Sequence, residues 1–143
     1  MSADIFEQLT SFTIAAGALD PSTRDSVREG LYATGHWLLT NERYADAAEV
    51  LRVMCMVAPG DERGFLALGA AHESEGQLEV AKDIYATGWA LSSPSVRCGI
   101  ALSRALRRLG DVDGSEEVLG ALCDSDIDDP DLAALVASER RAA

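Results

Sequence analysis

The stretch LYATGHWLLTNERYADAAEVL, residues 31–51, contains a glycine in the middle of a segment that otherwise suits a helix. A second stretch, FLALGAAHESEGQLEVAKDIY at residues 65–85, carries Gly69 at the same place as Gly35 in the first. A glycine inside a helix costs about 1 kcal/mol relative to alanine, so its recurrence requires a physical reason. Close packing provides one, because a glycine lets the first helix of a pair approach its neighbour.

The spacing between these glycines predicts the fold. It equals 34 residues, the difference between positions 35 and 69, and this is the period of the paired helices called tetratricopeptide repeats. Ala47 and Ala81 keep the same spacing and would form the small face of each second helix. The turns NERYADA (41–47), EGQLEVA (75–81) and LGDVDGS (109–115) also recur. The sequence therefore predicts three helix pairs, in units at 28–61, 62–95 and 96–129.

We expect a single all-α domain, a tetratricopeptide-repeat solenoid with an extra N-terminal helix and a C-terminal capping helix. Its 143 residues are enough to bury a core. Asp20-Pro21 and Asp129-Pro130 each place an N-cap before a proline at the first helical position. Residues 130–143 would cap the last repeat. Helices are predicted at about 3–16, 21–40, 44–57, 61–75, 78–91, 95–109, 112–123 and from 130 onward.

The N-terminal segment, residues 1–19, is more apolar than a simple cap requires. It could seal a partner subunit and make a homodimer, or fold back over the rest of the chain. The candidate dimerisation residues are Ile5, Phe6, Leu9 and Phe12.

The composition restricts the partners. The net charge is −12, from 24 acidic and 12 basic residues, which disfavours binding to nucleic acid or to an anionic membrane surface. No apolar run approaches the roughly 20 residues that span a bilayer, and MSADIFEQL lacks the features of a signal peptide. We expect a cytoplasmic protein.

The sequence predicts no metal site, cofactor or catalytic centre. Asp124, Asp126 and Asp128 begin like a calcium loop, but Asp129 stands at the turn glycine and Leu135 at the bidentate glutamate. His36 and His72 belong to no HExxH motif, and no nucleophile with an identifiable base emerges. Cys55, Cys98 and Cys123 form no CxxC pair, so we expect buried thiols, with one reactive thiol as the alternative.

The concave side of such a solenoid is lined by the first helix of each pair and forms an extended binding surface. Apolar positions there suit an extended peptide. Tyr32 and Leu39 could instead belong to the interhelix core. Arg97, Arg104 and Arg108 share a helix face and would either form surface ion pairs or make a basic end to the groove. The candidate lining is Tyr32, His36, Leu39, Leu66, Ala70, Ile100 and Arg104.

Two segments carry a family resemblance: LYATGHWLLTNERYADAAEVLRVMCMVAP (31–59) and GFLALGAAHESEGQLEVAKDIYATGWAL (64–91). They resemble the tetratricopeptide chaperones of bacterial type III secretion that hold the hydrophobic translocator proteins. The resemblance covers roughly residues 20–122 and includes the apolar, cysteine-containing end of the first unit, RVMCMVAP.

This resemblance implies a cytoplasmic bacterial chaperone, often dimeric through its N-terminal region, that binds an extended translocator segment without nucleotide. It adds Tyr44, Tyr85 and the neighbouring Val57 to Tyr32 and Leu66 as groove positions. His36 replaces a phenylalanine common in the family, which could make that pocket sensitive to pH. A chaperone of the secretion needle subunit and a general scaffold for folded proteins remain alternatives.

Overall fold

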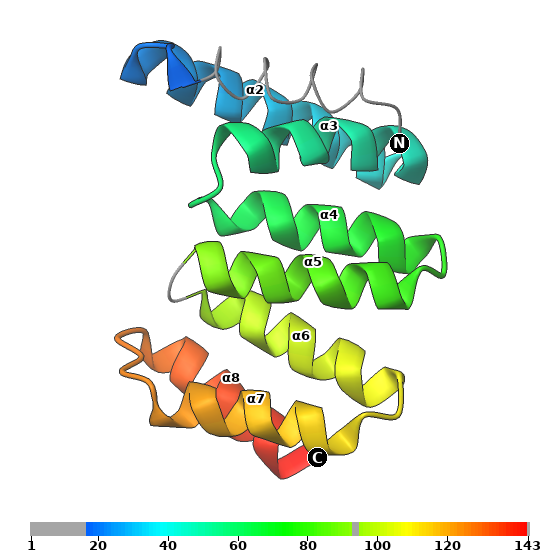
Figure 1. Cartoon of the computed structure of the whole chain (residues 1–143), viewed down its shortest axis with the longest axis vertical. Coiled ribbons are helices and arrows are strands. Elements are labelled where there is room, and N and C mark those ends of the chain that lie inside the picture. Colours follow the sequence, from blue (N-terminus) through cyan, green and yellow to red (C-terminus); the bar gives the residue numbers. More distant parts are fainter. Residues whose placement is uncertain (1–16, 93–94, 143) are drawn as a thin grey trace.

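The computed structural model describes residues 17–92 and 95–142, and in these ranges seven helices and no strand follow one another in a stack, joined by short connections (Figure 1). Their bounds agree with the helices predicted from residue 21 onward to within one residue, and the helix predicted at about 3–16 lies outside the described residues. The described helices are α2 (Pro21–Thr40), α3 (Tyr44–Val57), α4 (Glu62–Ser74), α5 (Leu78–Leu91), α6 (Val96–Arg108), α7 (Val112–Asp124) and α8 (Pro130–Ala142).

Side-chain caps define where most of these helices begin. The Asp20 carboxylate accepts a hydrogen bond from the backbone N–H of Thr23 at 3.0 Å, with Pro21 in the first turn, as predicted. Asp129 accepts one from the N–H of Asp131 at 2.9 Å and so caps α8. Such caps satisfy N–H groups that have no partner within the helix. Asp61, Ser95 and Asp111 cap α4, α6 and α7 in the same way.

The turn inside each helix pair uses one residue with a left-handed backbone. These residues are Glu42 at φ 59°, Gly76 at φ 76° and Gly110 at φ 87°. They are spaced by the repeat period, and glycine serves two of the three because it has no Cβ to oppose this conformation. The repeated turn returns the second helix along the first.

The recurring glycines lie where a helix pair packs most closely. A Cβ at Gly35 would lie 2.5 Å from Cδ2 of Leu51, and one at Gly69 would lie 2.5 Å from Cζ of Tyr85. The packing explanation is therefore confirmed, with one addition: large side chains of the second helix fill the space above each glycine. Ala47, one turn before Leu51, is fully buried beside them.

The curvature of the stack follows from which helices touch. The helices of each pair pack together, and α2 contacts α4, α4 contacts α6, and α6 contacts α8. Among the described residues, α3, α5 and α7 make no comparable contacts with one another. The first helices therefore line the shorter, concave side. At the end of the stack, α8 packs on both α6 and α7 and buries Val136.

Candidate peptide-binding groove

The concave side is crossed by ion pairs that join neighbouring helices one repeat apart. We call four of them the inner ion pairs. They are Arg63–Glu29 at 2.6 Å, Arg97–Glu62 at 2.8 Å, Arg108–Glu73 at 3.6 Å and Arg104–Glu139. The three arginines of the predicted basic stripe, in α6, are thus engaged with carboxylates of α4 and α8. The ion-pair alternative accounts for all three, while their side chains stay more than half exposed to a ligand.

An aromatic corner lies at the α2 end of the concave side. The guanidinium carbon of Arg63 lies 4.6 Å from the centroid of the Tyr32 ring, within the range of a cation–π contact. Asp61 holds that guanidinium with a 2.7 Å hydrogen bond, and the Arg63 hydrogen bond lowers the pKa of the Asp61 carboxyl. The His36 ring packs beside Tyr32 with a centroid distance of 5.9 Å. The corner therefore presents a fixed aromatic face and an exposed imidazole.

An apolar pocket lies at the other end, between α4, α6 and α8. Its volume is about 240 Å³. Arg97 and Arg104 complete its wall. It is suited to receive an apolar side chain from an extended segment. The apolar residues that line it are Leu66, Ile100, Ala101, Leu132 and Leu135.

Most predicted groove residues have a surface on which a ligand could bind. Tyr32, Leu39, Leu66 and Ala70 are half-buried on first helices, and His36 and Arg104 are exposed there. Leu39 also packs against the core between α2, α3 and α4, as its core alternative predicts, while its role in the groove stays a prediction. Ile100 is buried and forms part of the apolar pocket.

Tyr85 belongs to the core and not to the groove surface. Its side chain is almost fully buried because it fills the space above Gly69. This burial, with the nearby Glu73 carboxylate, raises the pKa of the Tyr85 hydroxyl. Tyr44 is half-buried at the start of α3, a second helix. Candidate dimerisation residues Ile5, Phe6, Leu9 and Phe12 lie outside the described residues.

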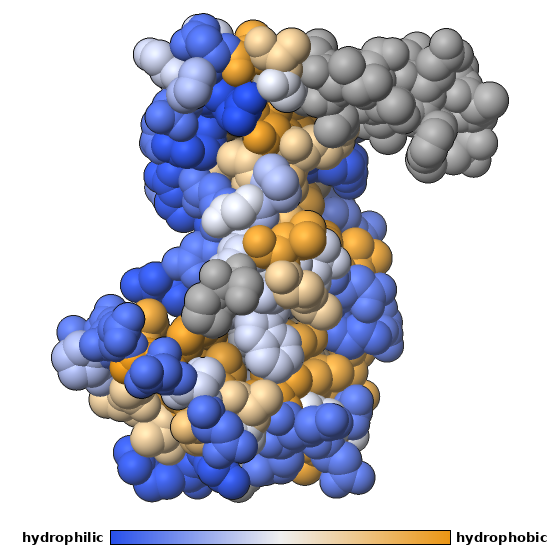
Figure 2. Space-filling view, turned by 60° about the vertical axis from the view of Figure 1, so that its left-hand side comes forward, coloured by the Kyte–Doolittle hydropathy of each residue, from blue (hydrophilic) through white to orange (hydrophobic). Residues whose placement is uncertain are grey.

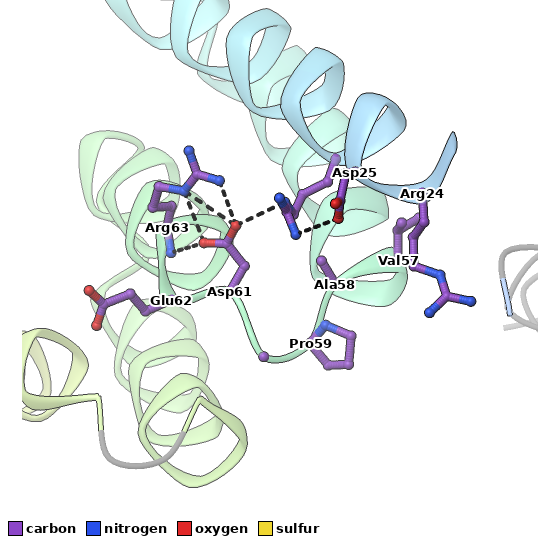
Figure 3. A pocket seen from close by; sticks show the side chains of 10 residues that line it. Arg24, Asp25, Val57, Ala58, Pro59, Asp61, Glu62 and Arg63 are labelled. Atoms are coloured by element: carbon purple, nitrogen blue, oxygen red, sulfur yellow. Dashed lines mark hydrogen bonds and ion pairs between the residues drawn. The ribbon is translucent and has the colours of Figure 1, made fainter. Parts of the chain in front are cut away.

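Val57 lies at a different cavity from the one predicted (Figure 3). This cavity of about 650 Å³ lies between the start of α2 and the connection from α3 to α4. Figure 3 shows charged side chains on its α2 wall, where Arg28 lies 3.0 Å from Asp25 and 3.5 Å from Asp61. Arg28 and Arg63 are paired with the cavity's own carboxylates, and Arg24 bonds the backbone carbonyls of Gly17 and Leu19. This charged lining suits an extended apolar segment less than the concave pocket does.

The sequence analysis missed the contribution of α8. The sequence predicts residues 130–143 only as a capping helix, but Leu132 and Leu135 of this helix also line the apolar pocket. Their spacing of three residues, with Val136 buried, could have indicated an apolar face shared between the cap and the groove.

Figure 2 shows apolar residues along a further face, the edge where connections such as α3–α4 lie. Trp37, which is 56% exposed, was also not singled out.

The cysteines differ in burial. The expectation of buried thiols is confirmed for Cys98 and wrong for Cys123, which is exposed, and burial raises the pKa of the half-buried Cys55 thiol to about 12. Across residues 17–92 and 95–142 no cluster of histidine, cysteine and acidic side chains is placed to hold a metal ion. In the same ranges, no helix combines the length and apolar character needed to cross a membrane.

Solved structures of other proteins share this architecture. No protein-family model and no curated protein matches the sequence. Among solved structures, PcrH from Pseudomonas aeruginosa is 29% identical, with a TM-score of 0.70 over 87% of this chain and 94% of PcrH. SycD, the type III secretion translocator chaperone of Yersinia enterocolitica, is 25% identical, with a TM-score of 0.68 over 81% of this chain and 89% of SycD.

The chain has the fold of the type III secretion translocator chaperones. The resemblance predicted from residues 31–59 and 64–91 is confirmed, as is the all-α solenoid of paired helices. PcrH has also been solved with the chaperone binding region of PopD, at 29% identity and a TM-score of 0.68 over 87% of this chain and 93% of that one. SycD has been solved with a peptide of the translocator YopD and as an alternative dimer.

Proposed function

We propose that this chain is a cytoplasmic bacterial chaperone that binds an extended segment of a hydrophobic translocator protein in its concave groove before type III secretion. The observation that carries the proposal is the shared fold, because PcrH and SycD have been solved with translocator segments. The concave side of this chain supplies suitable elements: the aromatic corner at Tyr32 and the apolar pocket beside Leu66.

The proposed mechanism is reversible binding of the client, with no chemical step. A client segment held in the groove lowers the concentration of free, aggregation-prone translocator and keeps it from associating early. Alternate side chains of an extended segment would enter the aromatic corner and the apolar pocket. Such binding requires no cofactor and no catalytic residue, so we propose that the chain is not an enzyme.

The two alternative functions have less support. A needle-subunit chaperone and a general scaffold would each use a repeat solenoid, but SycD has been solved with a peptide of YopD, and PcrH with the chaperone binding regions of PopB and of PopD. We also propose a homodimer formed through residues 1–19, because SycD has been solved as a dimer. Light scattering of the full chain and of a chain that lacks residues 1–19 tests this: a monomeric full chain, or a shortened chain that is still a dimer, refutes it.

Co-expression with the translocators encoded beside this chain tests the chaperone function. We expect a soluble complex that survives size-exclusion chromatography, and its loss when Tyr32→Ala and Leu66→Ala are combined. Val80→Ala is the matched control, because Val80 is an exposed apolar residue on α5, outside the groove. If the groove variant keeps its circular dichroism spectrum and still retains the client, the groove assignment is wrong. If the intact chain binds no translocator, the proposed function itself fails.

A further inference from the structure

The apolar pocket between α4, α6 and α8 lies in an unusual electrostatic setting. Helix α6 carries four arginines and no acidic residue, in a chain whose net charge is −12. Two of these arginines, Arg97 and Arg104, line the pocket together with apolar side chains. A ligand in this pocket therefore meets apolar surface and guanidinium groups together.

The apolar part of the pocket is built from three helices. Its floor is Ile100, which is 2% exposed, and its outer wall is Leu135 of α8, which is 39% exposed. Leu66 of α4 also lines the pocket. An aliphatic side chain placed here would cover Leu135, which water now contacts, and this burial favours binding.

The charges at the mouth of the pocket are arranged with the cations outermost. The Arg97 and Arg104 side chains are 52% and 54% exposed, whereas their partners Glu62 and Glu139 are 26% and 13% exposed. The pairs are neutral in sum, but an incoming segment meets guanidinium groups before it meets carboxylates. This order favours acidic neighbours of the apolar side chain over basic ones.

Each of these guanidinium groups also has more N–H donors than its ion pair uses. Within the described part of the chain, Arg97 uses Nη1 to bond Glu62, and Arg104 uses Nε and Nη2 to bond Glu139. A guanidinium has five N–H donors, so both arginines can bind a second carboxylate while keeping the first. Hydrogen bonds of this charged kind are stronger than neutral ones.

Helix geometry limits how far the carboxylate can lie from the apolar side chain. Arg97 precedes Ile100 by three residues and Arg104 follows Ala101 by three, which is about 4.5 Å along α6 in each direction. Residues two apart in an extended segment are roughly 6.6 Å apart and point to the same side. A carboxylate two residues before or after the apolar anchor therefore reaches one of the arginines, whereas a directly adjacent residue points to the other side.

We propose that this pocket selects, in the client segment, an aliphatic side chain with an aspartate or glutamate two residues before or after it. The proposal rests on the proposed chaperone function for the identity of its ligand. It makes Arg97 and Arg104 specificity-determining residues, and it assigns Leu132 and Leu135 of the capping helix to the binding surface. The occupant is thus an acidic, apolar, extended segment of the translocator.

A displayed library of random 12-residue peptides, selected on the full chain, tests the preference directly. We expect selected peptides to share an aliphatic residue with an acidic residue at a spacing of two positions. Replacing that acidic residue by its amide in the best peptide should weaken binding to the unmodified chain at least about tenfold. Peptides without acidic enrichment, a preference for lysine or arginine, an amide peptide that binds equally well, or no enriched peptide at all would each overturn the proposal.

Variants of the chain then locate the effect. The double variant R97Q/R104Q should bind the acidic peptide and its amide version equally, whereas R108Q should keep the difference. Arg108 is the matched control because it lies on α6 in an ion pair with Glu73 but does not line the pocket. Loss of the difference in R108Q as well, or its survival in R97Q/R104Q, would contradict the assignment. The amide comparison on the unmodified chain stands even where a variant fails to fold.

The two proposals fail separately. If translocators form a soluble complex with the chain but selected peptides show no acidic preference, the chaperone function stands and this pocket preference is wrong. If the acidic preference is found but no translocator binds, the pocket remains and its client belongs to another class.

Discussion

Replacing Gly69 by alanine should destabilise the protein, although alanine is the better helix former. The new methyl group would lie 2.5 Å from Cζ of Tyr85 and closer still to Cε1, in a helix pair where Tyr85 is 4% exposed. Overpacking of a core by one methyl group costs about 1–3 kcal/mol, and the gain in helix propensity offsets about 1 kcal/mol of that. Because the ring is confined, we expect a net loss of about 1–2 kcal/mol. This corresponds to a Tm lower by roughly 3–6 °C in a chain of this size.

Thermal and urea unfolding followed by circular dichroism measure this change. Gly30→Ala is the matched control, since Gly30 is in α2 and a Cβ there would meet no atom within 4 Å. It should stabilise the chain by about 0.5–1 kcal/mol. In a Tyr85→Leu background, which lacks Cε1 and Cζ, the effect of Gly69→Ala should shrink. If Gly69→Ala is as stable as the original chain, or the Tyr85→Leu background leaves its effect unchanged, the close-packing argument is wrong.

Three further predictions concern other features. Ellman's reagent at pH 8 should modify Cys123 rapidly, and Cys55 and Cys98 only after unfolding, because burial raises the pKa of both inner thiols; rapid modification of all three would contradict the packing. Ser95→Ala should lower the free energy of unfolding, measured in urea, by about 1–2 kcal/mol. The reason is that Ser95 caps α6 and also donates a 2.6 Å hydrogen bond to Glu62. Ser138→Ala is the control and should change this free energy little, because Ser138 is exposed on α8. The pKa of Asp61 is lower in the folded chain than its ordinary 3.8, so its stabilising contribution is present above about pH 4 and is lost as pH falls through the folded value. Arg63→Gln should make the free energy of unfolding depend less on pH in this acid range, and Arg43→Gln should change that dependence less. An equal effect of the two variants in urea unfolding at several pH values would show that the exposed Arg43–Asp46 pair contributes as much.

The fold could be predicted because it repeats. One glycine in a helix has several explanations, but Gly35 and Gly69, with Ala47 and Ala81 following at the same spacing, have one: helix pairs stacked with a constant period. The caps at Asp20 and Asp129 were equally visible, because they depend on local sequence. Periodicity and capping are properties of neighbouring residues, and the sequence displays both directly.

The binding surface was harder to predict because it depends on which helix faces which. Tyr32 and Tyr85 look alike in sequence, yet Tyr32 lies on a first helix beside Arg63, whereas Tyr85 lies on a second helix above Gly69. Helical periodicity places a residue on a face of its own helix but does not say what covers that face. The apolar pocket needs Leu66 and Leu135, which are far apart in sequence and meet only through the packing of α4 and α8 around α6.

The inner ion pairs join the first helices along the concave edge but hold them together only weakly. They fasten the concave edge of the stack, while the second helices on the convex edge are not fastened to one another to a comparable degree among the described residues. Exposed ion pairs of this kind are each worth only about 0–1 kcal/mol, so stretching one to admit a bulkier client segment requires little energy. We therefore expect the resistance of the inner edge to opening to fall further as salt screens the pairs. For the proposed chaperone, this predicts that bulkier client segments gain affinity relative to smaller ones as ionic strength rises.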